Sequence, residues 1–208
     1  MSTSELTKVL SQLHSHTRPS PEKISSLLSK AKRQLLELDA LLPTPTTPPH
    51  ILLLAREILE TGALMSIRLQ QPDAFTRYYQ QLLPFYELPE SSFKSSHHEA
   101  HRAHAKGQRS KVTALYLLLL LTKGDYAGFH TVLEGLEVEE AGTAGGSEKD
   151  EFIQYPVKLE RWLMEGSYDR VWGATKREGV PSEEFAVFSE VCTPPTSSSQ
   201  PTSVPTSH

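Results

Sequence analysis

The chain has 208 residues and a mass of 23.2 kDa, and its 25 acidic and 21 basic side chains give a net charge of −4. This length suits one domain with or without unstructured ends, and the charge balance argues against a general nucleic-acid or anionic-membrane binder. The single cysteine, Cys192, excludes an internal disulfide and a cysteine-based zinc site.

Two further observations concern where the protein acts. The longest apolar run, from Ala114 to Leu121, is too short to cross a membrane. The first residues contain no basic segment leading into an apolar stretch, so no secretory signal is recognised. We therefore expect a soluble intracellular protein.

Apolar side chains recur every three or four residues along most of the chain, which predicts helices. One predicted helix begins at Pro21, with Ser20 as its N-cap, and its apolar stripe extends to Leu42. We expect residues 1–42 to form a helical hairpin. A stiff connector rich in proline and threonine follows over residues 43–50.

The next predicted helix begins near Pro48 and Pro49 and carries two apolar stripes, so we expect it to lie between neighbouring helices. Gly62 and Ala63 would let a partner backbone approach it closely. No stretch alternates between apolar and polar residues as a strand would, and the predicted fold class is all-α. Further helices are expected over residues 72–86, 112–122, 126–136, 156–165, 168–175 and 181–191.

A short pattern recurs in which a helix is followed by a tight turn and a helix with an inward-facing apolar residue. Gly124 and Gly166 suit the left-handed position that ends a helix, and Asp125 and Ser167 can cap the next one. The spacing approaches that of helical solenoids, which predicts stacked, TPR-like helical hairpins over residues 51–191. The three occurrences begin at Gln71, Gly124 and Gly166.

Three stretches interrupt the helical pattern. A polar, histidine-rich stretch near residues 91–110 and an acidic, glycine-rich stretch near residues 137–150 are predicted to be flexible inserts. Residues 192–208 consist mostly of threonine, proline and serine. Such a composition cannot bury enough apolar area to offset chain entropy, so we predict a disordered tail.

The histidine cluster in the first insert is the one feature that suggests a metal. If this segment were helical, His97 and His101 would share a face, with His104 one turn further, and neutral imidazoles there could bind zinc. However, the metalloprotease pattern requires a glutamate directly after the first of two histidines four residues apart, and this spacing is absent. We interpret the cluster as part of a solvated loop, with metal binding as the alternative hypothesis.

No other pattern supports catalysis. The sequence has no phosphate-binding loop and no nucleophilic serine motif, so we predict a protein that is not an enzyme and uses no cofactor or small-molecule substrate. The large rings of Trp162, Tyr168 and Trp172 are more typical of a core than of a ligand cage. We interpret the basic residues near the first insert as a solvated charge run rather than a nucleic-acid site; they are Lys94, Arg102, Lys106, Arg109 and Lys111.

The stretch from Tyr155 to Tyr168 contains the string Met-Glu-Gly-Ser-Tyr, and it closely resembles the small PCI-domain subunits of the 26S proteasome lid. The resemblance implies a non-catalytic structural subunit built from helical repeats. In that family a winged helix follows, whereas here the tail begins after Val191, so we expect a chain without the winged helix. Shorter strings that resemble the family lie at residues 54–63, 66–68, 75–78, 88–91, 129–134 and 180–185.

The resemblance also implies the partners, namely other PCI-domain subunits of the lid, in the cytoplasm and nucleus, with no nucleic acid or membrane. Small PCI subunits of the COP9 signalosome and of translation initiation factor three are the alternative hypothesis. Large rings near the end of a solenoid are plausible anchors for a partner protein, although each could equally belong to the core. The candidate contact residues are Tyr155, Trp162, Tyr168 and Phe188.

Overall fold

The structure is a computed structural model that describes residues 2–14, 20–44, 46–93, 99–140, 150–176 and 180–191. Every regular element in these ranges is a helix, which confirms the predicted all-α fold class. None of the described helices is both long and apolar enough to cross a bilayer. In chain order they are α1 (Ser2–His14), α2 (Pro21–Glu37), α3 (Pro49–Arg68), α4 (Pro72–Tyr86), the 3-10 helix η1 (Glu90–Phe93), α5 (Glu99–Lys123), α6 (Tyr126–Glu140), α7 (Glu151–Met164), α8 (Tyr168–Thr175) and α9 (Glu183–Val191).

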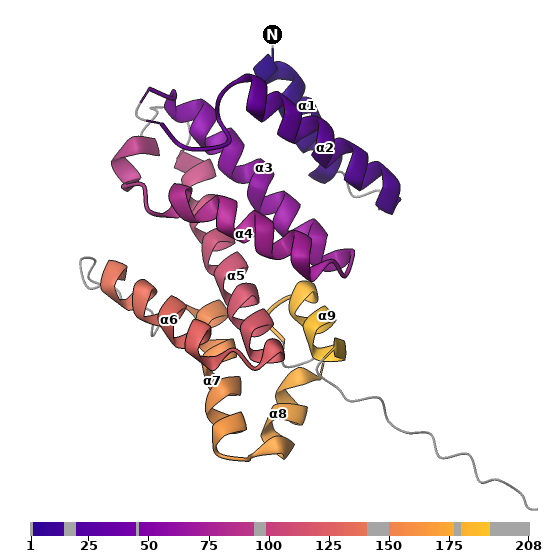
Figure 1. Cartoon of the computed structure of the whole chain (residues 1–208), viewed down its shortest axis with the longest axis vertical. Helices are drawn as coiled ribbons and strands as arrows, with labels where there is room; N and C mark the ends of the chain where they lie inside the picture. Colours follow the sequence, from indigo (N-terminus) through magenta and orange to yellow (C-terminus); the bar gives the residue numbers. More distant parts are fainter. Residues whose placement is uncertain are drawn as a thin grey trace, which may run out of the picture.

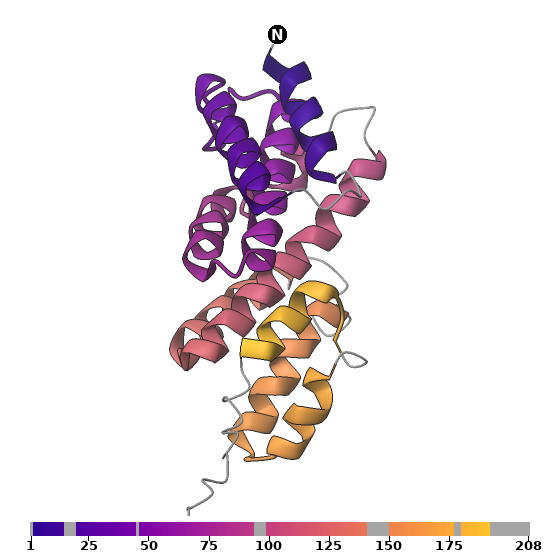
Figure 2. The ribbon, with the colours of Figure 1, turned by 90° about the vertical axis from the view of Figure 1, so that its right-hand side faces the viewer.

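Neighbouring helices pair and follow one another along the long axis of the molecule (Figure 1). Helices α1 and α2 lie at the end that carries the N-terminus, and α3 and α4 form the next pair. Helix α5 leads from this pair to α6 and α7, and α8 lies at the opposite end of the molecule (Figure 2). The stack brings α9 back against α3 and α5, which are far earlier in the sequence.

Helix α3 is the centre of the core. It packs against α1, α2, α4, α5 and α9, and every residue from Ile58 to Ile67 is buried. This confirms that the helix with two apolar stripes lies between neighbours on several sides. Because α3 has almost no solvent-facing turn over this stretch, its packing aligns the helices on either side of it.

At Gly62, a side chain of α4 packs tightly against the backbone of α3. A Cβ atom built at Gly62 would lie 2.5 Å from Cε1 of Tyr78, well inside van der Waals contact. The Tyr78 ring is buried, so it has little room to move away. A close approach at Gly62 is therefore present, but it is made by an aromatic ring of α4 and not by a partner backbone as predicted.

Four of the helices end in the same hydrogen-bonded turn, the Schellman motif. In each, a residue with positive φ donates its N–H to the carbonyl three residues back, and the next N–H reaches the carbonyl five residues back. The left-handed residues are Asp39, Gln70, Gly124 and Gly166, with φ of 50°, 55°, 69° and 70°. The prediction for the two glycines is confirmed, and the same turn occurs at two residues with side chains.

The capping predictions are partly confirmed. The carboxylate of Asp125 accepts a hydrogen bond of 2.9 Å from the N–H of Gly128 and so caps α6. Ser20 and Ser167 occupy the N-cap positions of α2 and α8, but neither side chain makes a capping hydrogen bond. At these two helices the position was right and the predicted side-chain contact was wrong.

The prediction that α2 extends to Leu42 is wrong. The helix ends at Glu37, because the left-handed turn at Asp39 redirects the chain. Ala40 then fills the buried position next to the helix end, and Leu42 is left exposed.

The two predicted inserts are partly helical. Residues 99–110, expected in a loop, form the first turns of α5, and residues 137–140 extend α6. Alanine, glutamate, arginine, lysine and glutamine are good helix formers, so this segment is helical without an apolar stripe of its own. Residues 141–149 and the predicted tail at residues 192–208 lie outside the described part of the chain.

Helix α7 begins before the predicted first residue, Pro156. Its N-cap is Asp150, whose carboxylate accepts a hydrogen bond of 3.1 Å from the N–H of Phe152. Pro156 therefore lies inside the helix, where its missing N–H leaves the carbonyl of Phe152 without its usual helical partner. Its ring is buried, and this apolar contact offsets part of the cost.

We expect Gly62→Ala to lower the free energy of unfolding by about 1–3 kcal/mol, because the new methyl group overlaps the buried Tyr78 ring. Gly135→Ala in α6 is the matched control, since a Cβ there meets nothing within 4 Å and alanine has the higher helix propensity. Urea denaturation of both variants measures the difference. Equal stabilities for the two alanine variants would contradict the proposed overlap.

The left-handed helix ends give a second pair of variants. Gln70→Gly should raise the free energy of unfolding by about 0.5–1 kcal/mol, because glycine adopts positive φ without steric cost. Gly124→Ala should lower it by about 1–2 kcal/mol, although a Cβ at this position meets no neighbouring atom. Thermal unfolding measures both shifts, and shifts of the same sign would refute the explanation by backbone conformation.

Candidate protein-interaction surface

The hairpin of α7 and α8 ends the stack on the side away from α1 (Figure 1). Helix α7 closes in the left-handed turn at Gly166, and α8 begins at once with Ser167 as its N-cap. Val171 and Ala174 of α8 pack against the core, but no residue of α8 is fully buried. One face of this short helix is therefore free of contacts with the described part of the chain.

The exposed side of this hairpin carries three large apolar side chains. Met164 at the end of α7 is 58% exposed, and Tyr168 and Trp172 on α8 are 62% and 51% exposed. Tyr168 and Trp172 are four residues apart, so they lie on one face of α8. We call Met164, Tyr168 and Trp172 the α8 surface. Exposed tyrosine and tryptophan are the side chains most often found to dominate binding energy in protein interfaces.

The four predicted contact residues fall in different environments. Tyr155 is only 8% exposed, and its hydroxyl donates a hydrogen bond of 3.0 Å to the carbonyl of Ala174. Trp162 is partly buried against the core, whereas Tyr168 is exposed. Phe188 lies in α9, but its side chain is outside the described part of the structure. The structure thus places Tyr155 inside the chain and Tyr168 on its surface.

The interpretation of Tyr168 and Trp172 as core rings is wrong, and the sequence contained a signal against it. On α8 these two rings share one helix face, while Val171 and Ala174 lie on the face that packs against the core. A helix of eight residues has room to bury only one such stripe. Met164 was not predicted as a contact residue. Its position beside the turn between α7 and α8 follows from the fold and could not be read from the sequence.

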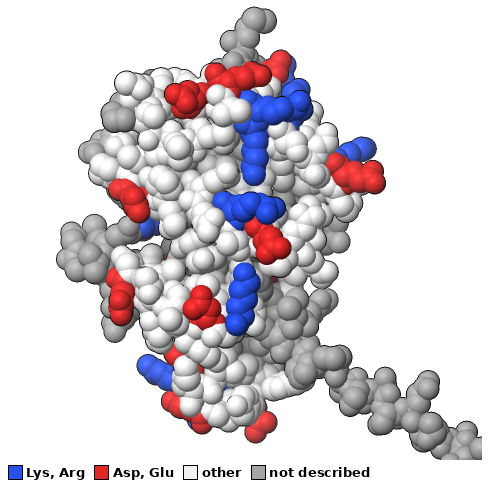
Figure 3. Space-filling model, viewed as in Figure 1, with Lys and Arg blue, Asp and Glu red and all other residues white. Residues whose placement is uncertain are grey.

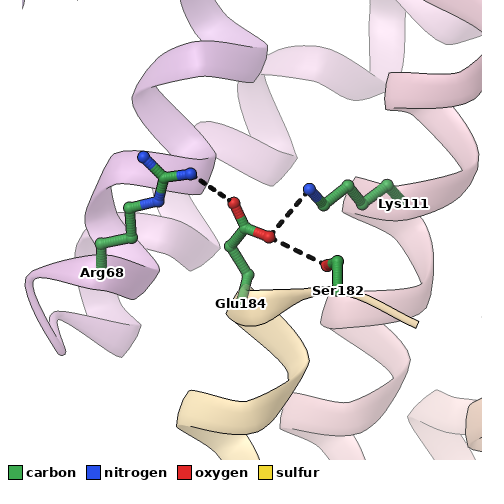
Figure 4. Close-up of polar contacts among 4 residues, drawn as sticks. All are labelled: Arg68, Lys111, Ser182 and Glu184. Atoms are coloured by element: carbon green, nitrogen blue, oxygen red, sulfur yellow. Dashed lines mark hydrogen bonds and ion pairs between the residues drawn. The ribbon is translucent and has the colours of Figure 1, made fainter. Parts of the chain in front are cut away.

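A buried carboxylate connects this half of the molecule to the central helix (Figure 4). The side chain of Glu184, at the start of α9, is 3% exposed. One carboxylate oxygen, Oε1, lies 2.8 Å from an Nη of Arg68 on α3. The other, Oε2, lies 2.8 Å from Nζ of Lys111 on α5 and accepts a hydrogen bond of 2.9 Å from the Ser182 hydroxyl. We call this arrangement the Glu184 junction.

The surroundings of Glu184 decide its protonation. Burial alone would raise the pKa of the carboxyl group, because the charged form loses its hydration. The hydrogen bond and charge of Lys111 act in the opposite direction, as do the N–H of Glu184 itself and the Ser182 hydroxyl. Together they lower the pKa of Glu184 from 4.5 to about 2. The carboxylate is therefore ionised and fully paired at neutral pH.

The junction shows that the interpretation of the basic run as solvated is wrong for two of its members. Lys111 is one partner of Glu184, and its side chain is only 18% exposed. The guanidinium of Arg109 lies 5.2 Å from the centroid of the buried Tyr86 ring. Both side chains are partly buried and lie on α5, which starts earlier than predicted. Lys94 and the side chains of Arg102 and Lys106 lie outside the described part.

The loop interpretation of the histidine cluster is wrong for His101 and His104, and the metal-binding hypothesis stays untested. His97 lies outside the described residues, and His101 and His104 belong to α5 but their side chains are not described. Within the described part of the chain, no group of three or more histidine, cysteine, aspartate or glutamate side chains could hold a metal ion.

Residues 108–188, which run from α5 into α9, match the model of the CSN8/PSMD8/EIF3K family. The 26S proteasome regulatory subunit RPN12 of Saccharomyces cerevisiae is 33% identical over 169 residues, which cover 79% of this chain and 57% of that protein. The rpn12 subunit of Schizosaccharomyces pombe is 30% identical over 77% of this chain and 54% of its own length. The non-ATPase regulatory subunit 8 homolog A of Arabidopsis thaliana is 31% identical over 80% and 57%.

The chain is homologous to these proteasome regulatory subunits. This confirms the resemblance inferred from the string around Met164–Tyr168. The chain spans a little over half the length of the RPN12 relatives it matches. The segment that matches the family model contains the α8 surface and three members of the Glu184 junction, Lys111, Ser182 and Glu184, whereas Arg68 lies before it.

The Glu184 junction predicts a stability that depends on pH. The folded pKa of Glu184 lies below its unfolded value, so its contribution is complete above pH 4.5 and is lost as the pH falls toward 2. We expect Glu184→Gln to lower the free energy of unfolding by about 2–4 kcal/mol at pH 7, with the difference from wild type shrinking below pH 4.5.

Urea denaturation between pH 7 and pH 3 measures this dependence. Glu183→Gln is the matched control, because Glu183 is the exposed neighbour of Glu184 on the same helix turn. If the two glutamine variants were equally stable at pH 7, the junction would not contribute to folding as described.

Proposed function

We propose that this chain is a non-catalytic structural subunit of the 26S proteasome lid and acts by holding neighbouring subunits through helix surfaces. The observation that carries the proposal is the similarity to RPN12 subunits over about four fifths of the chain. The all-helical stack supports it, because stacked hairpins present long, continuous surfaces to partners. Ubiquitin-dependent degradation would depend on this chain through assembly of the particle.

The α8 surface is the best candidate for a contact with another subunit. Its three side chains together expose an apolar area at the end of the stack, and no residue of α8 is buried by the described part of the chain. Burial of tyrosine and tryptophan rings in a partner releases water from both surfaces, and this is the main favourable term in association. Tyr168 stays in our proposal as a contact residue, and Met164 and Trp172 join it.

A small PCI subunit of the COP9 signalosome or of translation initiation factor three is not favoured. The family model carries the names of all three groups, but RPN12 and other proteasome subunits are the relatives that align over most of this chain. The metal-binding hypothesis for the histidine cluster gains no support from the described residues.

The test is affinity purification of the tagged full chain from cells, followed by quantitative mass spectrometry. We expect recovery of proteasome regulatory subunits, and we expect Tyr168→Ala/Trp172→Ala to reduce that recovery by about tenfold or more. The double variant should keep the wild-type unfolding temperature, because both side chains are exposed in the isolated chain.

Tyr126→Ala is the matched control, since Tyr126 is an exposed ring on another helix, α6. Recovery of signalosome or initiation-factor subunits without proteasome subunits would overturn the proposed function. Unchanged recovery with the double variant would leave the function standing and remove the α8 surface from it.

A further inference from the structure

A lysine on α2 is held against the face of a tyrosine on α4. Nζ of Lys32 lies 3.7 Å from the centroid of the Tyr78 ring, within the range of a cation–π contact. The same ring lies against Gly62 of α3. Because Tyr78 is fixed by this close packing, the Lys32 ammonium has a defined position on the surface between α2 and α4.

A second positively charged residue, Arg77, directly precedes Tyr78 on α4, and its side chain is exposed. Half-burial lowers the pKa of Lys32, and the guanidinium of Arg77, the residue before Tyr78, lowers it further by repulsion. We call Lys32 and Arg77 the α2–α4 basic pair. Lys32 has thus lost part of its hydration and is also repelled by Arg77. A bound anion would offset both unfavourable effects.

The described part of the chain supplies no such anion. Neither Lys32 nor Arg77 forms an ion pair with a described acidic side chain. Asp73 lies one helical turn before Arg77 but does not pair with it either. Lys30 on the same helix differs, because its Nζ lies 3.9 Å from the carboxylate of Glu5. The α2–α4 basic pair is therefore a cationic position without a described counter-charge, whereas its neighbour has one.

The surrounding surface supports an extended contact rather than a single ion. Figure 3 shows lysine and arginine side chains following one another down the middle of the face that carries α2 and α4, with acidic side chains at the edges of this face and also beside the lower part of the row. A row of this kind is complementary to a segment of chain with several negative charges.

We propose that the α2–α4 basic pair is a docking position for an acidic segment of a neighbouring protein chain, with a carboxylate of that segment between Lys32 and Arg77. The identification of the neighbour as a proteasome subunit rests on the proposed function. A nucleic acid fits less well, because the ring of Tyr78 is covered on one face by Lys32 and packed against Gly62, so it offers bases no platform for stacking.

The experiment uses the tagged full chain, purified with its partners and treated with a carbodiimide. This reagent joins an amine to a carboxylate as an amide without adding a spacer, so it reports only groups in contact. We expect Lys32 to form a cross-link to an aspartate or glutamate of another protein, identified by mass spectrometry, and Arg77→Glu to reduce that cross-link by about tenfold. Lys32→Arg should keep the partner but lose the cross-link.

The matched control is Lys8→Glu/Lys23→Glu, which makes the same charge change as Lys32→Glu/Arg77→Glu at two exposed lysines outside the pair. The control should retain the cross-linked partner, and the variant of the pair should lose it. Arg77→Glu alone guards against misfolding, because the Arg77 side chain is exposed. Equal recovery with both double variants would overturn the docking proposal.

The outcomes separate the two proposals. Proteasome subunits recovered without a cross-link at Lys32 would leave the function standing and contradict the docking position. A cross-link from Lys32 to an acidic segment of a protein outside the proteasome would support the docking position and contradict the function. If the wild-type chain recovered no partner protein, both proposals would fail.

Discussion

A buried carboxylate that has lost its hydration must be stabilised by positive charges or hydrogen-bond donors of the protein. For Glu184 the positive charges come from two helices that are remote from it in sequence. Arg68 of α3 and Lys111 of α5 each reach one oxygen of Glu184 at 2.8 Å. Breaking such a group apart would leave an uncompensated charge in a place where hydration is excluded, and this is far costlier than losing an exposed ion pair. Helix α9 can therefore dock in only one orientation, with its first turn against α3 and α5.

The apolar contacts around the junction follow from that orientation. Phe185, the residue after Glu184, is 1% exposed; it stacks near Phe152, with ring centroids 6.0 Å apart, and meets the edge of Tyr155 at 5.6 Å. Tyr155 in turn holds α8 through the carbonyl of Ala174. One chain of contacts thus leads from the central helix through α9 and α7 to the exposed rings of α8, so the α8 surface has a fixed position relative to the rest of the stack.

What the sequence predicted correctly is what local chemistry determines. The apolar period of α3, the left-handed glycines at residues 124 and 166 and the cap at Asp125 each depend on residues close in sequence. The missed features depend on tertiary contacts. Asp39 adopts positive φ although most residues with side chains avoid it, and Lys111 is paired with an acidic residue that lies 73 positions later in the sequence. The residues near Lys111 in the sequence therefore give no indication that Glu184 is its partner.

The α8 surface likewise combines a feature that the local sequence indicates with one that depends on tertiary contacts. The string that ends at Tyr168 identified the family, but which of its rings face solvent depends on the side of α8 that packs against the core. Tyr155 and Tyr168 are alike in type and opposite in environment, since one closes the contact between α7 and α8 and the other lies beyond it. Composition could name both as candidates, and only the fold separates them.

The central claim is that the Glu184 junction joins α9, α3 and α5 into one cooperative unit. Native-state hydrogen exchange under weakly denaturing conditions tests it most directly, because it measures the opening free energy of each helix separately. The account predicts that the protected amides in the first turn of α9 and those of α3 and α5 exchange with the same free energy, equal to that of global unfolding. Exchange of α9 through a separate opening of much lower free energy, while α3 and α5 stay protected, would contradict it.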